Sequence, residues 1–250
     1  DNSLIKGPVV TANGGTIDNA AGANILGDAV TLTSTQDIKN RGAAIIKSNS
    51  QTTLDARGNV SNTGQSVVVS GKDISIAAGG TVSNLEGAVV SAGRNAVVEA
   101  NTVLNSGQSL AANATADDVS TITGADVTVK AHGDVRNDAK ANLLATGTLN
   151  VQTGGSVSNV DANMAGSDVK LQAGTDVVNQ SGAIAGDRIH IDAQGSLLNT
   201  VKSTITAAAE VVMAAVSGVS NDNSLIKGPV VTANGGTIDN AAGANILGDA

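Results

Sequence analysis

An aliphatic residue followed two positions later by asparagine recurs eleven times along this 250-residue chain. Successive asparagines lie 19 to 22 residues apart, except for one interval of 32 residues. Length alone would allow one or two domains, but a repeat of this period predicts one continuous domain of stacked units over 1–250. The asparagines are Asn19, Asn40, Asn62, Asn84, Asn105, Asn137, Asn159, Asn179, Asn199, Asn221 and Asn240.

Two further apolar positions precede each asparagine. The positions ten, eight and two residues before it are all aliphatic or Met in seven of the eleven repeats, as with Ile74, Ile76 and Val82 before Asn84. Apolar residues at every second position indicate a strand rather than a helix. The other four repeats each have one exception, and these are Thr52, Thr11, Thr232 and Asn95.

Another short apolar patch follows each asparagine, as at Ile45-Ile46 and Val67–Val69. Small turn-forming residues separate the patches, so each repeat contains three short strands joined by tight turns. The sequence therefore predicts an all-β, three-sided parallel solenoid of about eleven coils. The alanine-rich stretch Ala207–Ala215 is also predicted as strand, because Val211 and Met213 stand ten and eight residues before Asn221.

The asparagines are expected to point inward, because residues i and i+2 of a strand share a face. An inward amide is costly unless it is hydrogen-bonded. Stacking at intervals of about 4.8 Å lets each amide bond the next, which predicts an asparagine ladder along a rod about 50 Å long. Asparagine also tolerates the left-handed backbone conformation, which we expect at the corner.

Composition agrees with a narrow solenoid. Aromatic residues make up 0% of the chain, which would be unusual for a globular core of this size but suits an interior one side chain wide. The chain has no cysteine, and its net charge of −8 argues against nucleic-acid partners. No signal peptide and no apolar run long enough to span a membrane is present.

Two irregularities interrupt the repeat. The interval between Asn105 and Asn137 is about half a coil too long, and we predict a loop insertion near 106–126, because solenoids accept insertions at turns. Residues 222–250 repeat residues 1–29 letter for letter. A recent duplication and an engineered segment that closes on itself as a fibre unit both remain open, and the second is favoured. Neither end has a polar cap, so the chain is interpreted as part of a longer solenoid.

Few residues are candidates for chemistry. His190 is expected to point outward between Ile189 and Ile191, and His132 to lie in a turn, so neither predicts a metal site. Asp117-Asp118 could bind a cation. Asp187-Arg188 is reminiscent of polysaccharide-cleaving solenoids, but its counterparts, Ser167 and Glu210 or Ala209, form no carboxylate array. The paired glycines Gly14-Gly15, Gly79-Gly80 and Gly154-Gly155 are predicted to be turn residues. We predict no catalytic residues, no metal site and no cofactor.

The repeat pattern resembles a known family. Gly-x-Val-x-Asn followed by Ala-Gly-x-x-Val-x-Ile, seen in 60–84 and 177–199, is similar to the haemagglutinin repeats of the filamentous haemagglutinin family of two-partner-secretion adhesins. The resemblance covers the chain apart from 106–126, and it implies a right-handed parallel β-helix. An Arg-Gly-Asp motif is absent, the nearest string being Arg57-Gly-Asn59. The secretion domain of the family is also absent, so receptor binding and export cannot be assigned to this segment.

The resemblance implies a function that the residues alone do not give. It implies the structural shaft of an adhesin that is secreted to the bacterial cell surface, is exported through an outer-membrane transporter and contacts host cells through other regions. An alternative is a shaft that itself binds a host glycan or protein, with 106–126 as the candidate binding segment. A polysaccharide-cleaving enzyme is the weakest alternative, and we expect the chain not to be an enzyme.

Overall fold

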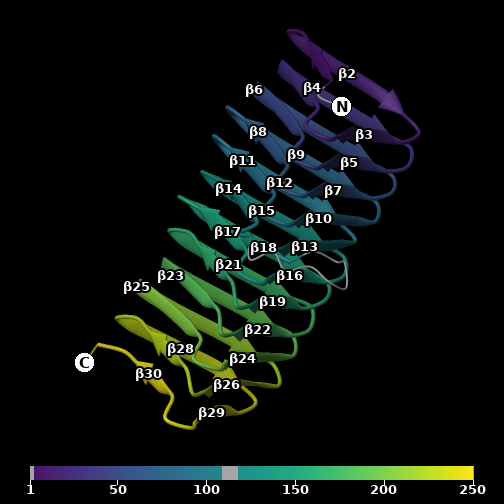
Figure 1. The fold of residues 1–250 in the computed structure, drawn as a ribbon. Helices are drawn as coiled ribbons and strands as arrows, with labels where there is room; N and C mark the ends of the chain where they lie inside the picture. The colour runs from purple at the N-terminus through teal and green to yellow at the C-terminus, as the bar shows by residue number, and fades with distance from the viewer. Residues whose placement is uncertain (1–2, 109–117, 250) are drawn as a thin grey trace.

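The computed structural model describes residues 3–108 and 118–249, and in these residues every regular element is a β-strand. The chain winds as a solenoid of stacked coils from the N-terminal to the C-terminal end (Figure 1). All strand pairs are parallel, and each strand pairs with strands of the coil before or after it. The predicted all-β parallel solenoid with about eleven turns is confirmed.

Each coil contributes to three rows of strands. The asparagine row is an 11-stranded sheet of its own. It consists of β3 (Ile17–Ala20), β5 (Ile38–Arg41), β7 (Val60–Thr63), β10 (Thr81–Leu85), β13 (Thr102–Ser106), β16 (Val135–Asp138), β19 (Val157–Val160), β22 (Val177–Gln180), β24 (Ser196–Thr200), β26 (Gly218–Asp222) and β29 (Ile238–Ala241).

The second row follows each asparagine, and the third row precedes the next one. Together they form a 19-stranded sheet, because four long strands with a bend run through both rows. These are β4 (Asn24–Ser34), β6 (Ile45–Ala56), β23 (Ala183–Ala193) and β25 (Thr204–Ala215). The strand predicted over Ala207–Ala215 is thus confirmed.

The remaining strands lie in one row each. The second row contains β1 (Leu4–Lys6), β8 (Val67–Ser70), β11 (Val89–Ala92), β14 (Thr121–Gly124), β17 (Asn142–Ala145), β20 (Asn163–Ala165), β27 (Leu225–Lys227) and β30 (Asn245–Leu247). The third row contains β2 (Val9–Gly14), β9 (Asp73–Ala78), β12 (Asn95–Ala100), β15 (Asp126–Ala131), β18 (Thr148–Thr153), β21 (Asp168–Ala173) and β28 (Val230–Gly235).

The core is a column of aliphatic side chains that all three rows supply. In one coil Val127 and Val129 come from the third row, Val135 from the asparagine row and Leu143 from the second row, and all four are fully buried. Each stacks on an aliphatic, alanine or methionine side chain of the neighbouring coils, so apolar surface is removed from water without aromatic rings.

The strand register corrects three of the four exceptions to the apolar pattern. Ala96, not Asn95, stacks on Ile74, and Asn95 is exposed because its coil is one residue shorter before the asparagine. Thr11 and Thr232 likewise pair with outward residues of the neighbouring strands. Only Thr52 is buried in the core, where its hydroxyl lies 2.8 Å from that of Ser48.

The predicted insertion near 106–126 is shorter than expected. Thr121–Gly124 form strand β14, which pairs in register with β11 and β17, and Asp126 begins β15. These residues belong to a regular coil, so the prediction of a loop was wrong for them. The remaining part, 109–117, lies outside the described residues.

The two identical segments form the same strands in different surroundings. Ile5 of β1 is 52% exposed, whereas its equivalent Ile226 of β27 is fully buried. The reason is that β27 lies between β25 and β30, while β1 pairs with β4. Burial here depends on the neighbouring coil and not on local sequence.

Candidate functional site

The asparagine ladder is the most regular polar feature of the molecule. The Nδ2 of each ladder asparagine from Asn19 to Asn221 donates to the Oδ1 of the next, at 2.8 or 2.9 Å in all ten steps. These ten side chains are at most 4% exposed, and Asn240 is exposed. The predicted inward ladder is therefore confirmed, and each amide hydrogen bond runs in the same direction along the rod.

The ladder amides also tie the corners of the coils together. Asn84 Nδ2 donates to the carbonyl of Ala88 at 3.0 Å in its own corner and to that of Thr121 at 3.1 Å in the next coil. Among the described residues no buried side-chain nitrogen or oxygen lacks a hydrogen-bond partner. The cost of burying an amide in an aliphatic core is thus offset at each rung.

The corner after each ladder asparagine differs from the prediction. The left-handed residues lie two and three positions after the asparagine, as at Ala21 and Gly22, and no ladder asparagine has a positive φ. The asparagines keep strand geometry because they belong to the pleated row. Val201 is the unfavourable case, since a β-branched residue there has φ of +59°.

Aspartates just before the asparagine row form a second set of contacts between coils, which the sequence analysis did not identify. Asp134 Oδ1 accepts from the backbone nitrogen of Ser156 at 2.8 Å, and Asp176 Oδ1 accepts from that of Ser196 at 2.7 Å. Asp37 does the same for Asn59 at 2.9 Å. The sequence signal for these contacts is an Asp or Asn that recurs three residues before the ladder asparagine.

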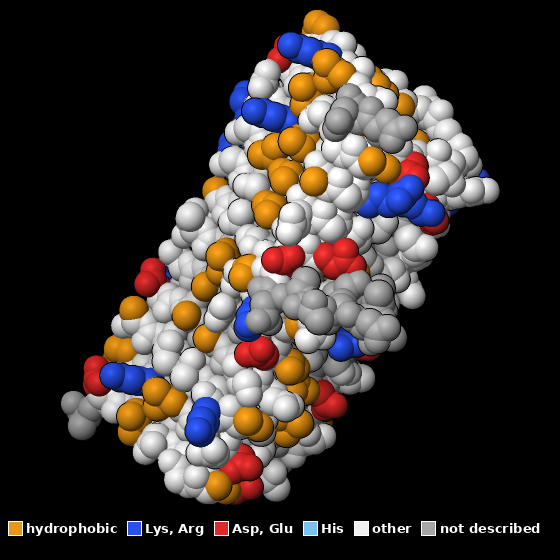
Figure 2. All heavy atoms as spheres, in the orientation of Figure 1, with side chains coloured by type: hydrophobic (Ala, Val, Ile, Leu, Met, Phe, Trp, Pro, Cys, Tyr) orange, Lys and Arg blue, Asp and Glu red, His pale blue; other side chains and the backbone are white. Residues whose placement is uncertain are grey.

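Ion pairs also join neighbouring coils. Arg41 donates to both carboxylate oxygens of Asp18, at 3.0 and 2.7 Å. This hydrogen bond lowers the pKa of Asp18 below its ordinary value, and the positive charge of Arg41 adds to the effect. On the face shown in Figure 2, charged side chains of both signs occur in small groups. Such exposed pairs contribute little to stability individually.

The residues singled out for chemistry are not brought together. His132 and His190 are both exposed. Arg188 binds Asp168 through two hydrogen bonds of 2.6 and 3.0 Å, and the register places Glu210 opposite Arg188 rather than opposite Asp187. The guanidinium is therefore already engaged by a neighbouring carboxylate.

Of the possible cation site at Asp117-Asp118, Asp117 lies outside the described residues. Asp118 accepts a hydrogen bond from Gln65 at 3.3 Å. Within 3–108 and 118–249, no group of three or more His, Cys, Asp or Glu side chains could hold a metal ion.

Gly15, Gly79-Gly80 and Gly154-Gly155 lie in turns as predicted, but Gly14 is the last residue of strand β2, so the prediction was wrong for it. Close packing between coils is what requires two of these glycines. A Cβ on Gly79 would lie 2.3 Å from the carbonyl oxygen of Arg57, and one on Gly154 would lie 2.4 Å from that of His132. Neither glycine has a positive φ, so they are needed for the close approach of backbones and not for a left-handed turn.

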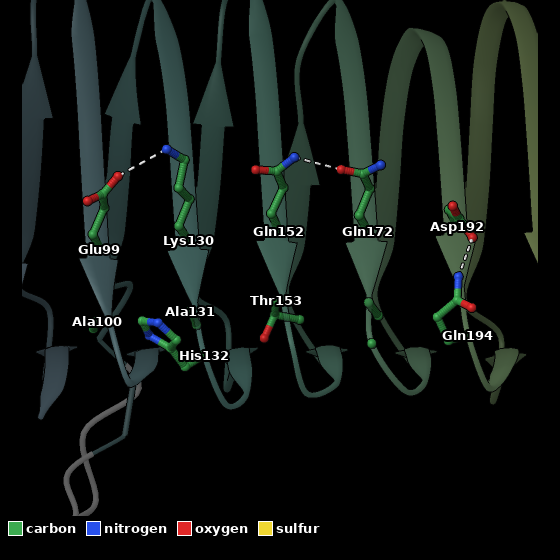
Figure 3. Close-up of a pocket in the computed structure, with 12 residues that line it drawn as sticks. Glu99, Ala100, Lys130, Ala131, His132, Gln152, Thr153, Gln172, Asp192 and Gln194 are labelled. Atoms are coloured by element: carbon green, nitrogen blue, oxygen red, sulfur yellow. Dashed lines mark hydrogen bonds and ion pairs between the residues drawn. The ribbon is translucent and has the colours of Figure 1, made fainter.

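A groove of about 690 Å³ lies along the outer side of the third row, where the strands end (Figure 3). One wall is a column of outward side chains from successive coils, and the base contains Ala100, Ala131 and Ala173. We call the wall the polar column. It consists of Glu99, Lys130, Gln152, Gln172 and Asp192, which the strand register places directly next to one another.

Two glycines lie at the corner beside the groove, and Gly174 is one of its lining residues. His132, Gly154, Gly174 and Gln194 occupy the same corner position in four successive coils, since each donates its backbone N–H to the preceding coil in the same way. The glycines leave a gap between His132 and Gln194. Sequence reasoning missed this groove, because outward positions align only once the one-residue differences between coils are known.

Comparisons with known proteins do not extend the resemblance seen in the sequence. No family model, no curated protein and no solved structure matches the chain. In the parts of the chain that the structure describes, no helix has the length and apolar character needed to cross a membrane. The fold is thus the one property established for this chain, a parallel β-solenoid with an asparagine ladder.

Proposed function

We propose that this chain is a structural shaft of a secreted bacterial surface adhesin, which holds adhesive regions of a longer protein away from the cell. The observation that carries the proposal is the continuity of the ladder, ten bonded steps without a break. Every coil contacts the next through three rows of strands, the amide column and an aliphatic core. A rod built in this way keeps its length and direction, which is what a spacer requires.

The similarity to filamentous haemagglutinin repeats supports the adhesin part of the proposal. It also suggests export through an outer-membrane transporter and contact of the parent protein with host cells. The small differences in coil length, with asparagines 19 to 22 residues apart outside the one long interval, support a shaft because they leave the strands in register. Solenoid coils interact with their nearest neighbours only, so coils can be added or removed without changing the architecture.

Coil deletion tests the shaft directly. Removing 160–179 takes out one whole coil, from the residue after Asn159 through Asn179, and should shorten the folded rod by about 4.8 Å. The matched control removes 160–169, half a coil, and should abolish cooperative folding because inward and outward positions no longer stack. Electron microscopy measures the rod length of the two variants, and circular dichroism measures their melting. If both deletions left a cooperatively folded rod, a shaft built on strand register would be contradicted.

Display on bacteria tests the adhesin part. The chain is anchored to the cell surface and joined to a known receptor-binding peptide, and adhesion to host cells should require the peptide while the chain alone confers none. Loss of adhesion when the coil 160–179 is removed would show that the shaft does more than act as a spacer. Adhesion by the displayed chain without the peptide would refute a passive shaft and favour the alternative, a shaft that itself binds a host glycan or protein.

A further inference from the structure

The groove beside the third row has hydrogen-bonding groups that the fold leaves available. Lys130 Nζ donates to Glu99 at 3.1 Å, and Gln152 Nε2 donates to Gln172 Oε1 at 2.7 Å. The Gln152 oxygen then faces the Lys130 side of the polar column, and the Gln172 nitrogen faces the Asp192 side (Figure 3). Among the described residues these two atoms have no hydrogen bond with another side chain of the column.

These atoms create two slots, each bordered by a donor and an acceptor. The first lies between Lys130 Nζ and Gln152 Oε1, and the second between Gln172 Nε2 and the carboxylate of Asp192. A hydroxyl group both donates and accepts, so it satisfies either slot, whereas an anion would meet Glu99 or Asp192 and a cation would meet Lys130. The slots are two coils apart, or about 10 Å.

The base of the groove suits the remaining surface of such a ligand. Ala100 and Ala173 are buried beneath it, and Gly174, which lines the groove, has no side chain to fill it. The volume of about 690 Å³ lies within the range of ligand sites in proteins. Ala131, which is partly exposed at the base, is the apolar contact available to a sugar ring whose hydroxyls reach the polar column.

We propose that the groove binds a neutral linear oligosaccharide along the rod axis, with hydroxyls in the slots at Lys130/Gln152 and Gln172/Asp192. The ion pair of Glu99 with Lys130 and the contact of Gln194 with Asp192 at 3.5 Å hold these side chains in place. This proposal goes beyond the shaft and does not depend on it. Its ligand is a neutral linear oligosaccharide and not a host-cell receptor, so the displayed chain alone is still expected to confer no adhesion.

Calorimetric titration of the full chain with cellopentaose, at ligand concentrations up to about 1 mM, tests the site. The double variant Gln152→Ala/Gln172→Ala should weaken binding about tenfold or more, because each slot loses one hydrogen-bonding group. The matched control is Asn150→Ala/Lys170→Ala, two residues earlier on the same strands and outside the groove. It should bind as the parent chain does.

Three results would overturn the proposal. The first is that cellopentaose gives no heat of binding and does not change the side-chain NMR signals of Gln152 and Gln172. The second is that the control variant loses as much binding as the Gln152→Ala/Gln172→Ala variant. The third is that a heparin pentasaccharide binds more tightly than cellopentaose. Melting temperatures of both double variants show whether the fold is intact. Deletion of 160–179 also removes Gln172 from the groove, so the two proposals are separated by deleting 41–62, the coil from the residue after Asn40 through Asn62, which contains no groove residue. Failure of one proposal then does not imply failure of the other.

Discussion

Replacement of one ladder asparagine by leucine, which has a similar shape, tests the amide column. In Asn159→Leu, the Oδ1 of Asn179 loses the donor that lies 2.8 Å away and is buried without another side-chain donor among the described residues. The carbonyls of Ala162 and Ala183 lose bonds of 3.0 and 3.1 Å. Asn137 Nδ2 keeps its bonds to Ala141 and Asn163.

The structure supplies a matched control one coil further on. In Asn179→Leu, the Oδ1 of Asn199 also loses its ladder donor, but it still accepts a hydrogen bond from Ser203 Oγ at 2.8 Å. An unsatisfied buried acceptor costs about 1–3 kcal/mol and a lost neutral hydrogen bond about 1 kcal/mol. We therefore expect Asn159→Leu to lower the free energy of unfolding by about 3 kcal/mol and Asn179→Leu by about 1–2 kcal/mol.

Urea unfolding followed by circular dichroism measures both values. Adding Ser203→Ala to Asn179→Leu should remove the compensation and bring the loss close to that of Asn159→Leu. Equal losses in the two single variants, or no loss in either, would refute the reasoning that the ladder stabilises the fold through acceptor satisfaction.

Three further predictions follow from the corners and the surface. Val201→Asn should raise the free energy of unfolding by about 1 kcal/mol, because asparagine tolerates the left-handed φ of +59°, and a lower melting temperature would contradict this. Gly182→Ala should be destabilising, since its Cβ would lie 2.6 Å from Asn159 Nδ2 and 2.7 Å from Asn179 Oδ1, whereas Gly15→Ala, with nothing within 4 Å, should melt like the parent. Asp18 has a pKa below its ordinary value because of Arg41, so its stabilisation is present above the unfolded pKa of about 3.9 and is lost as the pH falls through the lower folded pKa. Because the ion pair is exposed, its contribution to the free energy of unfolding is less than about 1 kcal/mol. The Asp18→Asn variant should therefore lose less stability on acidification than the parent chain. An acid transition that is unchanged in this variant would contradict a stabilising Asp18–Arg41 pair.

The positions that bury side chains could be predicted from the sequence, because burial imposes a strict pattern. The eleven asparagines, and aliphatic residues such as Val82 and Leu197, stack where the repeat placed them. Counting from the asparagine failed at Asn95, where the coil is one residue shorter and Ala96 is the inward residue. Strand contacts fix the register, and turns absorb the change in length.

Surface features were less predictable for a physical reason. The position of the left-handed corner residues depends on where the chain must reverse, and that point follows the asparagine by two residues, as at Asp161 and Ser181. The polar column requires Glu99, Lys130 and Gln152 to be adjacent in space, although 31 and 22 residues separate them along the chain. Neither feature leaves a periodic apolar signal.

The common direction of the ladder bonds gives the molecule an electrical axis. Each side-chain amide turns its N–H toward the C-terminal coil and its oxygen toward the N-terminal coil, so ten small dipoles add instead of cancelling. In most sheets the backbone dipoles alternate and leave little net moment. Here buried amides, rather than peptide groups or surface charges, make the C-terminal end of the column relatively positive.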